Sequence, residues 1–316
     1  MVGAQPPGDR LSGPSPSGPA GDPAFGRFRL EAELARQPGR VSYRAVDLDD
    51  GGIVALKVID LVGDRAGRAL LARRFERETA VLRALRHPGI VRIVGAGSGA
   101  FAGSDAASSA ERKGPGIERA WVATRFVEGG ELLGWLARPG GGTRAQRALR
   151  AASQATAALA HAHRHGVLHR DVKPANVLVE HAGGQVVLAD FGLAAWHDAA
   201  RTQTGLLPGT PTYMAPEVLA GAAPSVAADV YSLGATIYHA LTGRPPHRGA
   251  TLGELFQAVA RQPVAPASTE VPGLPGEVDR LLQDCLASTP ARRPRHLGEL
   301  SQAFADLAQR LPQPPA

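Results

Sequence analysis

The stretch "IVALKVID", residues 53–60, has the composition of a buried β-strand and yet carries one charged side chain, Lys57. β-Branched residues near both ends of the run favour a strand, and the turn signal "DDGG", residues 49–52, precedes it. Burying an ammonium group is costly unless an anion meets it. A lone lysine in a strand commonly extends its ammonium to the surface, so the alternative, a buried partner for Lys57, needs support from elsewhere in the chain.

The low lysine content of the chain is a first indication that Lys57 has a specific role. Of the 35 lysine and arginine residues, only Lys57, Lys113 and Lys173 are lysines. Arginine therefore occupies almost every cationic position. A lysine in such a chain is a candidate for a place that requires a compact, flexible ammonium group.

Composition bounds the class of protein. The 316 residues suffice for one large domain or two lobes, and 44% hydrophobic with 20% charged residues is typical of globular proteins. A single cysteine, Cys285, excludes an intramolecular disulfide and fits a reducing compartment. No apolar run has the length of a membrane span, and the N-terminus lacks the apolar core of a signal peptide, so we expect a soluble, cytoplasmic protein. The arginines behind the formal charge of +6 are dispersed, and we interpret them as solvated faces and not as a nucleic-acid site.

The chain changes character along its length. Residues 1–24 are rich in Pro, Gly and Ser, and we expect a disordered tail there. Apolar spacing predicts an amphipathic helix over 65–86. Two strands, predicted at 90–96 and 119–127, flank a small-residue segment that we interpret as a mobile loop. From Thr143, a suitable N-cap, the pattern becomes mainly helical.

Four motifs in the second half carry a resemblance to a known family. In order, they are "VLHRDVKPANVL" (167–178), "LADFGLA" (188–194), "GTPTYMAPE" (209–217) and "ADVYSLGATIYHALTGRPP" (228–246). Each triplet within them recurs by chance, but this order and spacing are highly specific. From about Phe25 to about Leu307, the chain resembles the eukaryotic-like serine/threonine protein kinases of bacterial type.

The resemblance implies an α+β fold with two lobes. A small β-rich N-lobe with one helix would span residues 25–127, and a larger, mainly helical C-lobe would span 128–308. Together they would form the kinase domain, 25–308, with tails at 1–24 and 309–316.

The resemblance also implies the catalytic residues and the cofactors, ATP and Mg²⁺. Asp171 of His-Arg-Asp would accept the proton of a protein Ser or Thr hydroxyl, and Lys173 would contact the γ-phosphate. Lys57 in "VALK" would bind the α- and β-phosphates and pair with Glu78, which gives the strand lysine its expected partner. Asn176 and Asp190 would hold Mg²⁺, a hard cation that prefers oxygen ligands.

The nucleotide site follows from the same resemblance. Val41 and Ala55 would cover the adenine from one side and Leu178 from the other. Thr124 would be the gatekeeper at the back of the pocket, followed by hinge residues Arg125 and Val127 that recognise adenine through their backbone. Glu131 would reach the ribose.

Supporting contacts are implied as well. Glu217 should pair with Arg293 as a scaffold contact, and Asp229 should anchor the catalytic loop from beneath. His169 and Phe191 should belong to an apolar column that couples the lobes. Closely spaced histidines at 161, 163 and 165 invite a metal interpretation, but residues two apart on a helix point in different directions and chelate poorly.

One motif departs from the family pattern. The phosphate-covering loop should read G-x-G-x-x-G, and here Ala35, Gln37 and Arg40 take the three glycine positions. Pro38 fixes φ and removes an N–H donor, while Gly39 is out of place. Because glycine lets backbone N–H groups approach the phosphates, we expect weak ATP affinity, with Arg40 in part replacing those groups as a charged donor.

Two other functions compete with a protein kinase. A pseudokinase scaffold would explain the altered phosphate loop, although such proteins usually lose one of the catalytic residues that are all retained here. A small-molecule phosphotransferase would share the base and metal ligands but would not need "GTPTYMAPE", which shapes a peptide-binding shelf. The expected partners are thus ATP and protein substrates, with a homodimer as the arrangement in which one copy phosphorylates the other.

We predict phosphorylation of Thr202, Thr204 or both, which lie between Asp190 and Glu217. A phosphothreonine adds about −1.5 to −2 charges, and Arg170 of His-Arg-Asp is the cation expected to bind them. Mass spectrometry of the purified protein should find this phosphate, and the Lys57→Met variant should lack it. Unmodified threonines in a fully active enzyme would show instead that both are ordinary loop residues.

Overall fold

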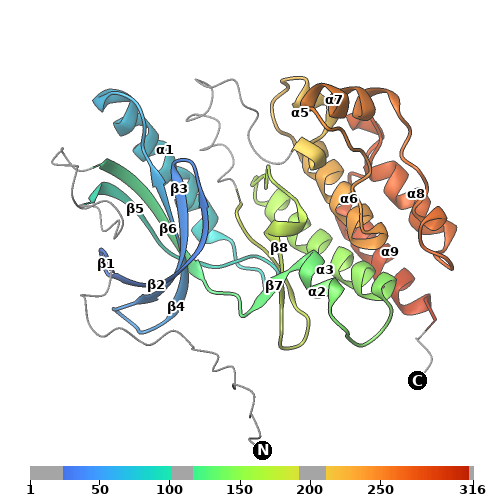
Figure 1. Ribbon diagram of the computed structural model, residues 1–316, viewed down its shortest axis with the longest axis horizontal. Helices are drawn as coiled ribbons and strands as arrows, with labels where there is room; N and C mark the ends of the chain where they lie inside the picture. Colours follow the sequence, from blue (N-terminus) through green and yellow to red (C-terminus); the bar gives the residue numbers. More distant parts are fainter. Residues whose placement is uncertain (1–23, 102–116, 192–210, 313–316) are drawn as a thin grey trace, which may run out of the picture.

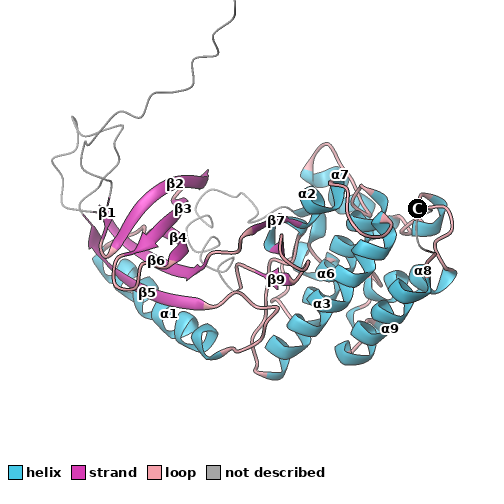
Figure 2. Ribbon diagram, turned by 90° about the horizontal axis from the view of Figure 1, so that it is seen from below, coloured by secondary structure: helices cyan, strands magenta, loops and turns pink. Residues whose placement is uncertain are grey.

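The computed structural model describes residues 24–101, 117–191 and 211–312, and it consists of two lobes. A sheet with one long helix forms the first lobe, and packed helices with a small sheet form the second (Figures 1 and 2). The chain crosses between them after residue 125. The predicted α+β, two-lobed fold is confirmed.

The first lobe is a six-stranded antiparallel sheet in the order β1-β2-β3-β4-β6-β5. Alternate side chains of each strand face the core, which explains the burial of Val54, Leu56 and Val58 in β4. Helix α1 packs on the sheet through Phe75, which is fully buried. The elements are β1 Ala24–Phe25, β2 Phe28–Gln37, β3 Arg40–Asp47, β4 Ile53–Asp60, α1 Arg65–Ala84, β5 Ile93–Phe101 and β6 Ile117–Arg125.

Strand β5 extends further than the sequence predicts. Its last residues, 97–101, belong to the segment expected to be a loop, and residues 102–116 lie outside the described part. The Trp121 ring of β6 explains the small residues here, because a Cβ on Gly95 or Gly97 would come within 3.2 and 3.0 Å of it. Glycine in this strand therefore makes room for the ring and does not mark a turn.

The second lobe is built around two long helices. Helix α3 begins at the predicted N-cap Thr143, whose hydroxyl accepts from the Gln146 N–H, and the Gln146 side chain accepts in return from the Thr143 N–H. The lobe elements are β7 Gly129–Glu131, α2 Leu132–Ala137, α3 Arg144–Arg164, β8 Val177–Glu180, β9 Val186–Leu188, α5 Pro216–Leu219, α6 Val226–Thr242, α7 Leu252–Arg261, α8 Gly276–Cys285 and α9 Leu297–Arg310. Among the described helices, none combines the length and the apolar character needed to cross a bilayer.

Helices α6 and α8 approach each other closely at Gly234. A Cβ at this position would lie 2.7 Å from the Cβ of Cys285, so only glycine fits. The Cys285 thiol is fully buried, and burial raises its pKa to about 12. Cys285 is therefore an unreactive core residue.

A buried ion pair joins the segment before α6 to the end of the lobe. Arg293 is fully buried and makes two parallel bonds to Glu217, from Nη1 to Oε1 at 2.6 Å and from Nη2 to Oε2 at 2.8 Å. It also donates to the carbonyls of Ala227 and Ala287. The predicted scaffold pair is confirmed, with the two-pronged geometry that favours arginine over lysine.

We predict that Glu217→Gln destabilises the fold by about 3–5 kcal/mol, because the Arg293 charge would stay buried without its counter-charge. Urea denaturation should show the loss as a lower midpoint at unchanged slope. Glu277→Gln is the matched control, since Glu277 pairs with Arg310 at the surface and should leave the midpoint unchanged. Equal shifts in the two variants would contradict a special role for the buried pair.

Candidate active site

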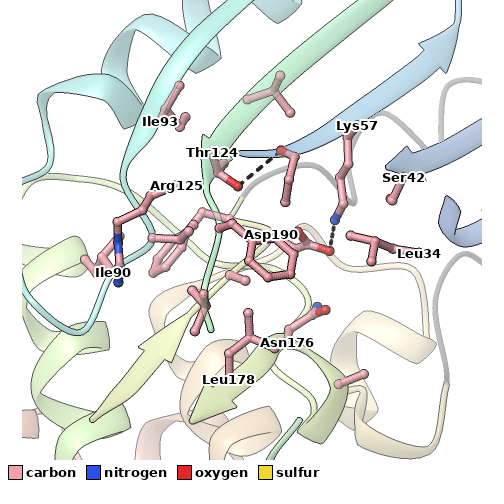
Figure 3. A pocket seen from close by; sticks show the side chains of 18 of the residues that line it. Leu34, Ser42, Lys57, Ile90, Ile93, Thr124, Arg125, Asn176, Leu178 and Asp190 are labelled. Atoms are coloured by element: carbon pink, nitrogen blue, oxygen red, sulfur yellow. Dashed lines mark hydrogen bonds and ion pairs between the residues drawn. The ribbon is translucent and has the colours of Figure 1, made fainter. Parts of the chain in front are cut away.

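A cavity of about 350 Å³ lies between the two lobes, a volume within the range of small-molecule sites (Figure 3). Its roof comes from β4 and its floor from β8, while the segment after β6 closes the back. Seven of the eight residues expected to bind the nucleotide line it: Ala55, Lys57, Thr124, Arg125, Val127, Glu131 and Leu178. The expected metal ligands, Asn176 and Asp190, line it as well.

The expectation for Val41 is wrong, because the strand register points this side chain to the other face of the sheet. Val41 is paired with Val58 and lines a separate cavity, whereas its neighbour Ser42 is paired with Lys57 and lines the central one. Directly paired residues share a face, and successive residues alternate. Ser42 and Leu34 are therefore the roof residues that sequence reasoning missed, and counting from Lys57 across the hairpin would have found Ser42.

The segment after β6 offers backbone groups to the cavity. Val127 is 8% exposed, and within the described chain its N–H and carbonyl make no hydrogen bond. The Thr124 hydroxyl is held by the Ala55 carbonyl at 3.4 Å. The Arg125 guanidinium pairs with Glu180 at 2.7 Å. A molecule bound in the cavity would therefore meet the backbone of Arg125 and not its charged group.

Lys57 does not reach the surface. Its side chain is 15% exposed, and its ammonium forms an ion pair with Asp190 inside the cavity (Figure 3). Burial raises the pKa of the Asp190 carboxyl, but the Lys57 ammonium and the nearby Arg40 charge outweigh this, and the pKa lies below its ordinary value. Asp190 also adopts a φ of 66°, in the left-handed region that is uncommon for non-glycine residues. The carboxylate is thus ionised and held in a special backbone conformation at the cavity wall.

The structure corrects the expected ion pair between Lys57 and Glu78. Glu78 instead accepts from Arg74, one helical turn earlier, at 3.1 Å and lies 3.9 Å from the Arg170 guanidinium. Helix α1 therefore directs this carboxylate toward the arginine of His-Arg-Asp, and Lys57 satisfies its charge with the nearer Asp190.

The residues around Asp171 form a tight polar cluster that borders the cavity through Asn176. The Lys173 ammonium donates to Asp171 Oδ2 at 2.7 Å. The Asn176 amide donates to the same oxygen at 2.9 Å and to the Asp171 carbonyl at 2.7 Å. One carboxylate oxygen thus accepts two bonds, which fixes the direction of the group and leaves Oδ1 to accept from a bound molecule.

The loop carrying this cluster is held from beneath by Asp229 of α6, as expected. Asp229 is 2% exposed and accepts from the backbone N–H groups of His169 and Arg170, both at 2.8 Å. The His163 ring nitrogen Nε2 lies 2.8 Å from the same carboxylate. This role of His163 was missed in the sequence, where the surrounding histidines raised only the metal interpretation.

His169 joins the loop to the Asp-Phe-Gly segment. Its ring is fully buried and lies 4.3 Å from that of Phe191, centre to centre, which places both in the expected column. Burial lowers the pKa of His169 although Asp229 and Asp171 act in the opposite direction. A neutral ring lets Nδ1 accept the Asp171 N–H at 3.3 Å.

The donor set of the cavity fits a hard divalent cation. The Asn176 amide nitrogen is used within the protein, so its oxygen is available, and Asp190 adds a carboxylate at the same end of the cavity (Figure 3). No cluster of three His, Cys, Asp or Glu side chains suited to a metal occurs in the described residues. A cation here would therefore need further oxygen ligands from a bound molecule or water, as is usual for Mg²⁺.

The phosphate-covering hairpin between β2 and β3 turns at Pro38 and Gly39. Gly39 has a φ of 72°, and a proline followed by a glycine of positive φ is the sequence of a type II turn. Gly39 therefore serves the turn, although it lies off the three glycine positions of the family motif. Arg40 bonds to Gln37 across the hairpin at 2.8 Å.

Comparisons with known proteins agree with this geometry. The protein kinase domain family model matches residues 37–305. The crystal structure of the PknI kinase domain of Mycobacterium tuberculosis superposes with a TM-score of 0.66 at 28% identity, covering 92% of this chain and all of that one.

Two longer relatives are also protein kinases. The serine/threonine-protein kinase PknJ of Mycobacterium tuberculosis is 36% identical over 301 residues, which cover 89% of this chain and 45% of PknJ. The DNA damage-responsive serine/threonine-protein kinase RqkA of Deinococcus radiodurans is 34% identical over 289 residues, which cover 90% of this chain and 40% of RqkA. This chain thus spans less than half of either relative.

We predict that Ser42→Phe and Val41→Phe have different effects on nucleotide binding. The first places a ring in the central cavity and should weaken the binding of a fluorescent ATP analogue at least tenfold. The second places the same ring on the opposite face and should leave the affinity within about twofold. Fluorescence titration measures both, and the reverse ranking would show that the β3 register is different.

Proposed function

The chain belongs to the protein kinase family, and on that premise we propose that it transfers the γ-phosphate of ATP to Ser or Thr hydroxyls of proteins. The observation that carries the proposal is the hydrogen-bonded cluster of Asp171, Lys173 and Asn176, whose member Asn176 lines the nucleotide-sized cavity together with Asp190. All the charged groups that phosphoryl transfer requires are present in this one place.

Asp171 is the proposed base. Lys173 and Asn176 hold its Oδ2, so Oδ1 can orient a substrate hydroxyl and accept its proton as the phosphorus–oxygen bond forms. Lys173 lies beside the position of the transferred group and can stabilise its charge. A lysine two residues after the base is typical of Ser/Thr-directed members of the family, which supports the substrate class.

The phosphates would be held by Lys57, Asp190 and Asn176. Asp190 and Asn176 would bind Mg²⁺, which neutralises phosphate charge when present. The Lys57 ammonium would contact the α- and β-phosphates. Arg40, close enough to lower the pKa of Asp190, would supply the charge that the missing glycine amides cannot, and we expect weak ATP affinity.

The adenine would bind between Ala55 above and Leu178 below. The N–H and carbonyl of Val127 have no partner in the described chain and would pair with the edge of the base. The Arg125 carbonyl is next to them, and Glu131 at the cavity mouth would reach the ribose.

The observed ion pairs imply a rearrangement before catalysis. Once a phosphate group competes for Lys57, its pair with Asp190 would loosen, and a rotation of α1 would bring Glu78 to the ammonium. Arg170 would then be free to bind a phosphothreonine. Thr202 and Thr204, the candidates for that modification, lie outside the described residues, as does Thr210.

A protein substrate fits better than a small molecule. The segment Pro211–Tyr213 is anchored on α6 through the Tyr213 hydroxyl, 2.7 Å from Nδ1 of His239, and Glu217 is fixed by Arg293. A segment fixed in this way would offer a peptide a shelf that a small substrate would not need. A cytoplasmic setting, where ATP is available, and autophosphorylation between two copies complete the proposal.

We predict that Asp171→Asn lowers phosphoryl transfer at least about hundredfold while nucleotide binding stays within twofold. The substitution removes the proton acceptor and leaves the phosphate ligands in place. Radiolabelled ATP with a generic protein substrate measures transfer, and a fluorescent ATP analogue measures binding. Asp306→Asn on the exposed face of α9 is the matched control and should be indistinguishable from wild type.

Two outcomes would contradict the proposal. Near wild-type transfer by Asp171→Asn would exclude this residue as the base. Nucleotide binding by the wild type without any transfer, in the phosphorylated as well as the unmodified protein, would favour the pseudokinase scaffold.

A further inference from the structure

Another cavity, of about 470 Å³, lies in the second lobe outside the nucleotide site. Four segments form it: the end of α2, the chain between α2 and α3, the first turns of α3, and the turn that joins β8 to β9. Figure 1 shows α2, α3 and β8 lying together in this part of the lobe. The proposed transfer reaction uses none of the residues that line this cavity.

Its lining is basic. Arg138, Arg147 and Arg150 line the cavity together with His181, and no aspartate or glutamate is among the described lining residues. Across the described ranges of the chain, none of these three arginines forms an ion pair with a carboxylate. Arginines on a protein surface commonly alternate with acidic residues, so an uncompensated group of three around one cavity creates a local positive potential.

Arg147 is the buried member of the group, with 8% of its surface exposed. Its guanidinium lies 5.0 Å from the centre of the Trp135 ring and donates to the carbonyls of Trp135 and Leu136 at 3.3 and 2.9 Å. Its Nε is buried without a hydrogen-bond partner. The two carbonyls are dipoles and balance the positive charge of Arg147 only in part. A buried cation is stabilised most by a group with a full negative charge.

Glycines bring the backbone close to these cations. A Cβ on Gly140 would lie 2.8 Å from Nη1 of Arg147, so the loop passes directly over the guanidinium. Gly183 and Gly184, in the turn between β8 and β9, both have positive φ values, 80° and 67°. Because these positions lack side chains, a bound group can approach the backbone as well as the arginines.

We propose that this cavity binds a phosphoserine or phosphothreonine side chain of a peptide. A phosphomonoester carries close to two negative charges and three acceptor oxygens, which match guanidinium donors better than a carboxylate does. Clusters of arginines are the usual means of recognising such groups in peptides. The volume exceeds that of a lone phosphate ion, and the Trp135 ring offers an apolar wall for the residues that flank the modified one. The inference concerns binding alone and does not rest on the transfer reaction.

The test is fluorescence anisotropy with the full chain and no nucleotide. The probe is a labelled nine-residue peptide with one central phosphothreonine, compared with the same peptide carrying threonine. The double variant Arg138→Gln with Arg150→Gln removes two exposed arginines and leaves the buried Arg147 in place. Arg261→Gln with Arg280→Gln, two exposed arginines on α7 and α8, is the control with the same loss of charge.

We expect the phosphopeptide to bind at least tenfold more tightly than its threonine twin. The Arg138 and Arg150 double variant should lose at least tenfold in affinity, while the control variant stays within twofold. Added salt should weaken the binding, as expected for contacts between charges at a surface.

Three results would overturn the proposal. Equal binding of both peptides would show that the phosphate is not recognised, and equal affinity of the two double variants would place the site elsewhere. Equally strong competition by inorganic phosphate, or by an oligonucleotide of matched charge, would show a site for free anions or for polyanions in general. Since no ATP takes part, failure here leaves the proposed transfer activity untouched.

Discussion

The buried carboxylate of Asp229 is the interaction on which the active-site geometry depends. It accepts the backbone N–H groups of His169 and Arg170 and lies against His163, so one side chain of α6 fixes the loop and the end of α3 at once. Arg170 has a φ of 68°, a conformation that costs free energy for a non-glycine residue and persists only when the surroundings hold it. The direction of Asp171 follows from this restraint.

The charged side chains of the active site are paired with one another in this structure. The partly buried ionised groups of the site are paired: Lys57 with Asp190, and Lys173 with Asp171. The Glu78 carboxylate forms ion pairs with Arg74 and Arg170. Such ion pairs offset part of the free-energy cost of removing charges from water. They also engage the ammonium and carboxylate groups that a nucleotide and its metal ion would need. Binding therefore has to replace protein–protein ion pairs by protein–phosphate contacts.

The small sheet of the second lobe links the two cavities. Leu178 of β8 forms the floor of the nucleotide site, and the turn at the far end of the same strand, with Gly183 and Gly184, walls the basic cavity. Strands β8 and β9 are paired antiparallel from the Val177–Leu188 pair to the Val179–Val186 pair, so the hairpin connects the two cavities through one continuous ladder. The central cavity lies between the lobes and the basic cavity in the second lobe, and this hairpin contributes to both.

The sequence by itself determined the family, the α+β fold, the N-cap Thr143 and nine of the residues that line the central cavity, since these follow from motifs, spacing and local hydrogen bonding. Only the tertiary structure decided which face of β3 meets the cavity, because a shift of one residue exchanges Val41 for Ser42 and leaves the apolar pattern almost unchanged. It also decided that glycines after Ile93 form a strand, since the reason for them is a ring on a neighbouring strand. The partner of Lys57 was likewise a matter of tertiary structure: Glu78 and Asp190 are both suitable anions, and the position of α1 relative to the sheet selects between them.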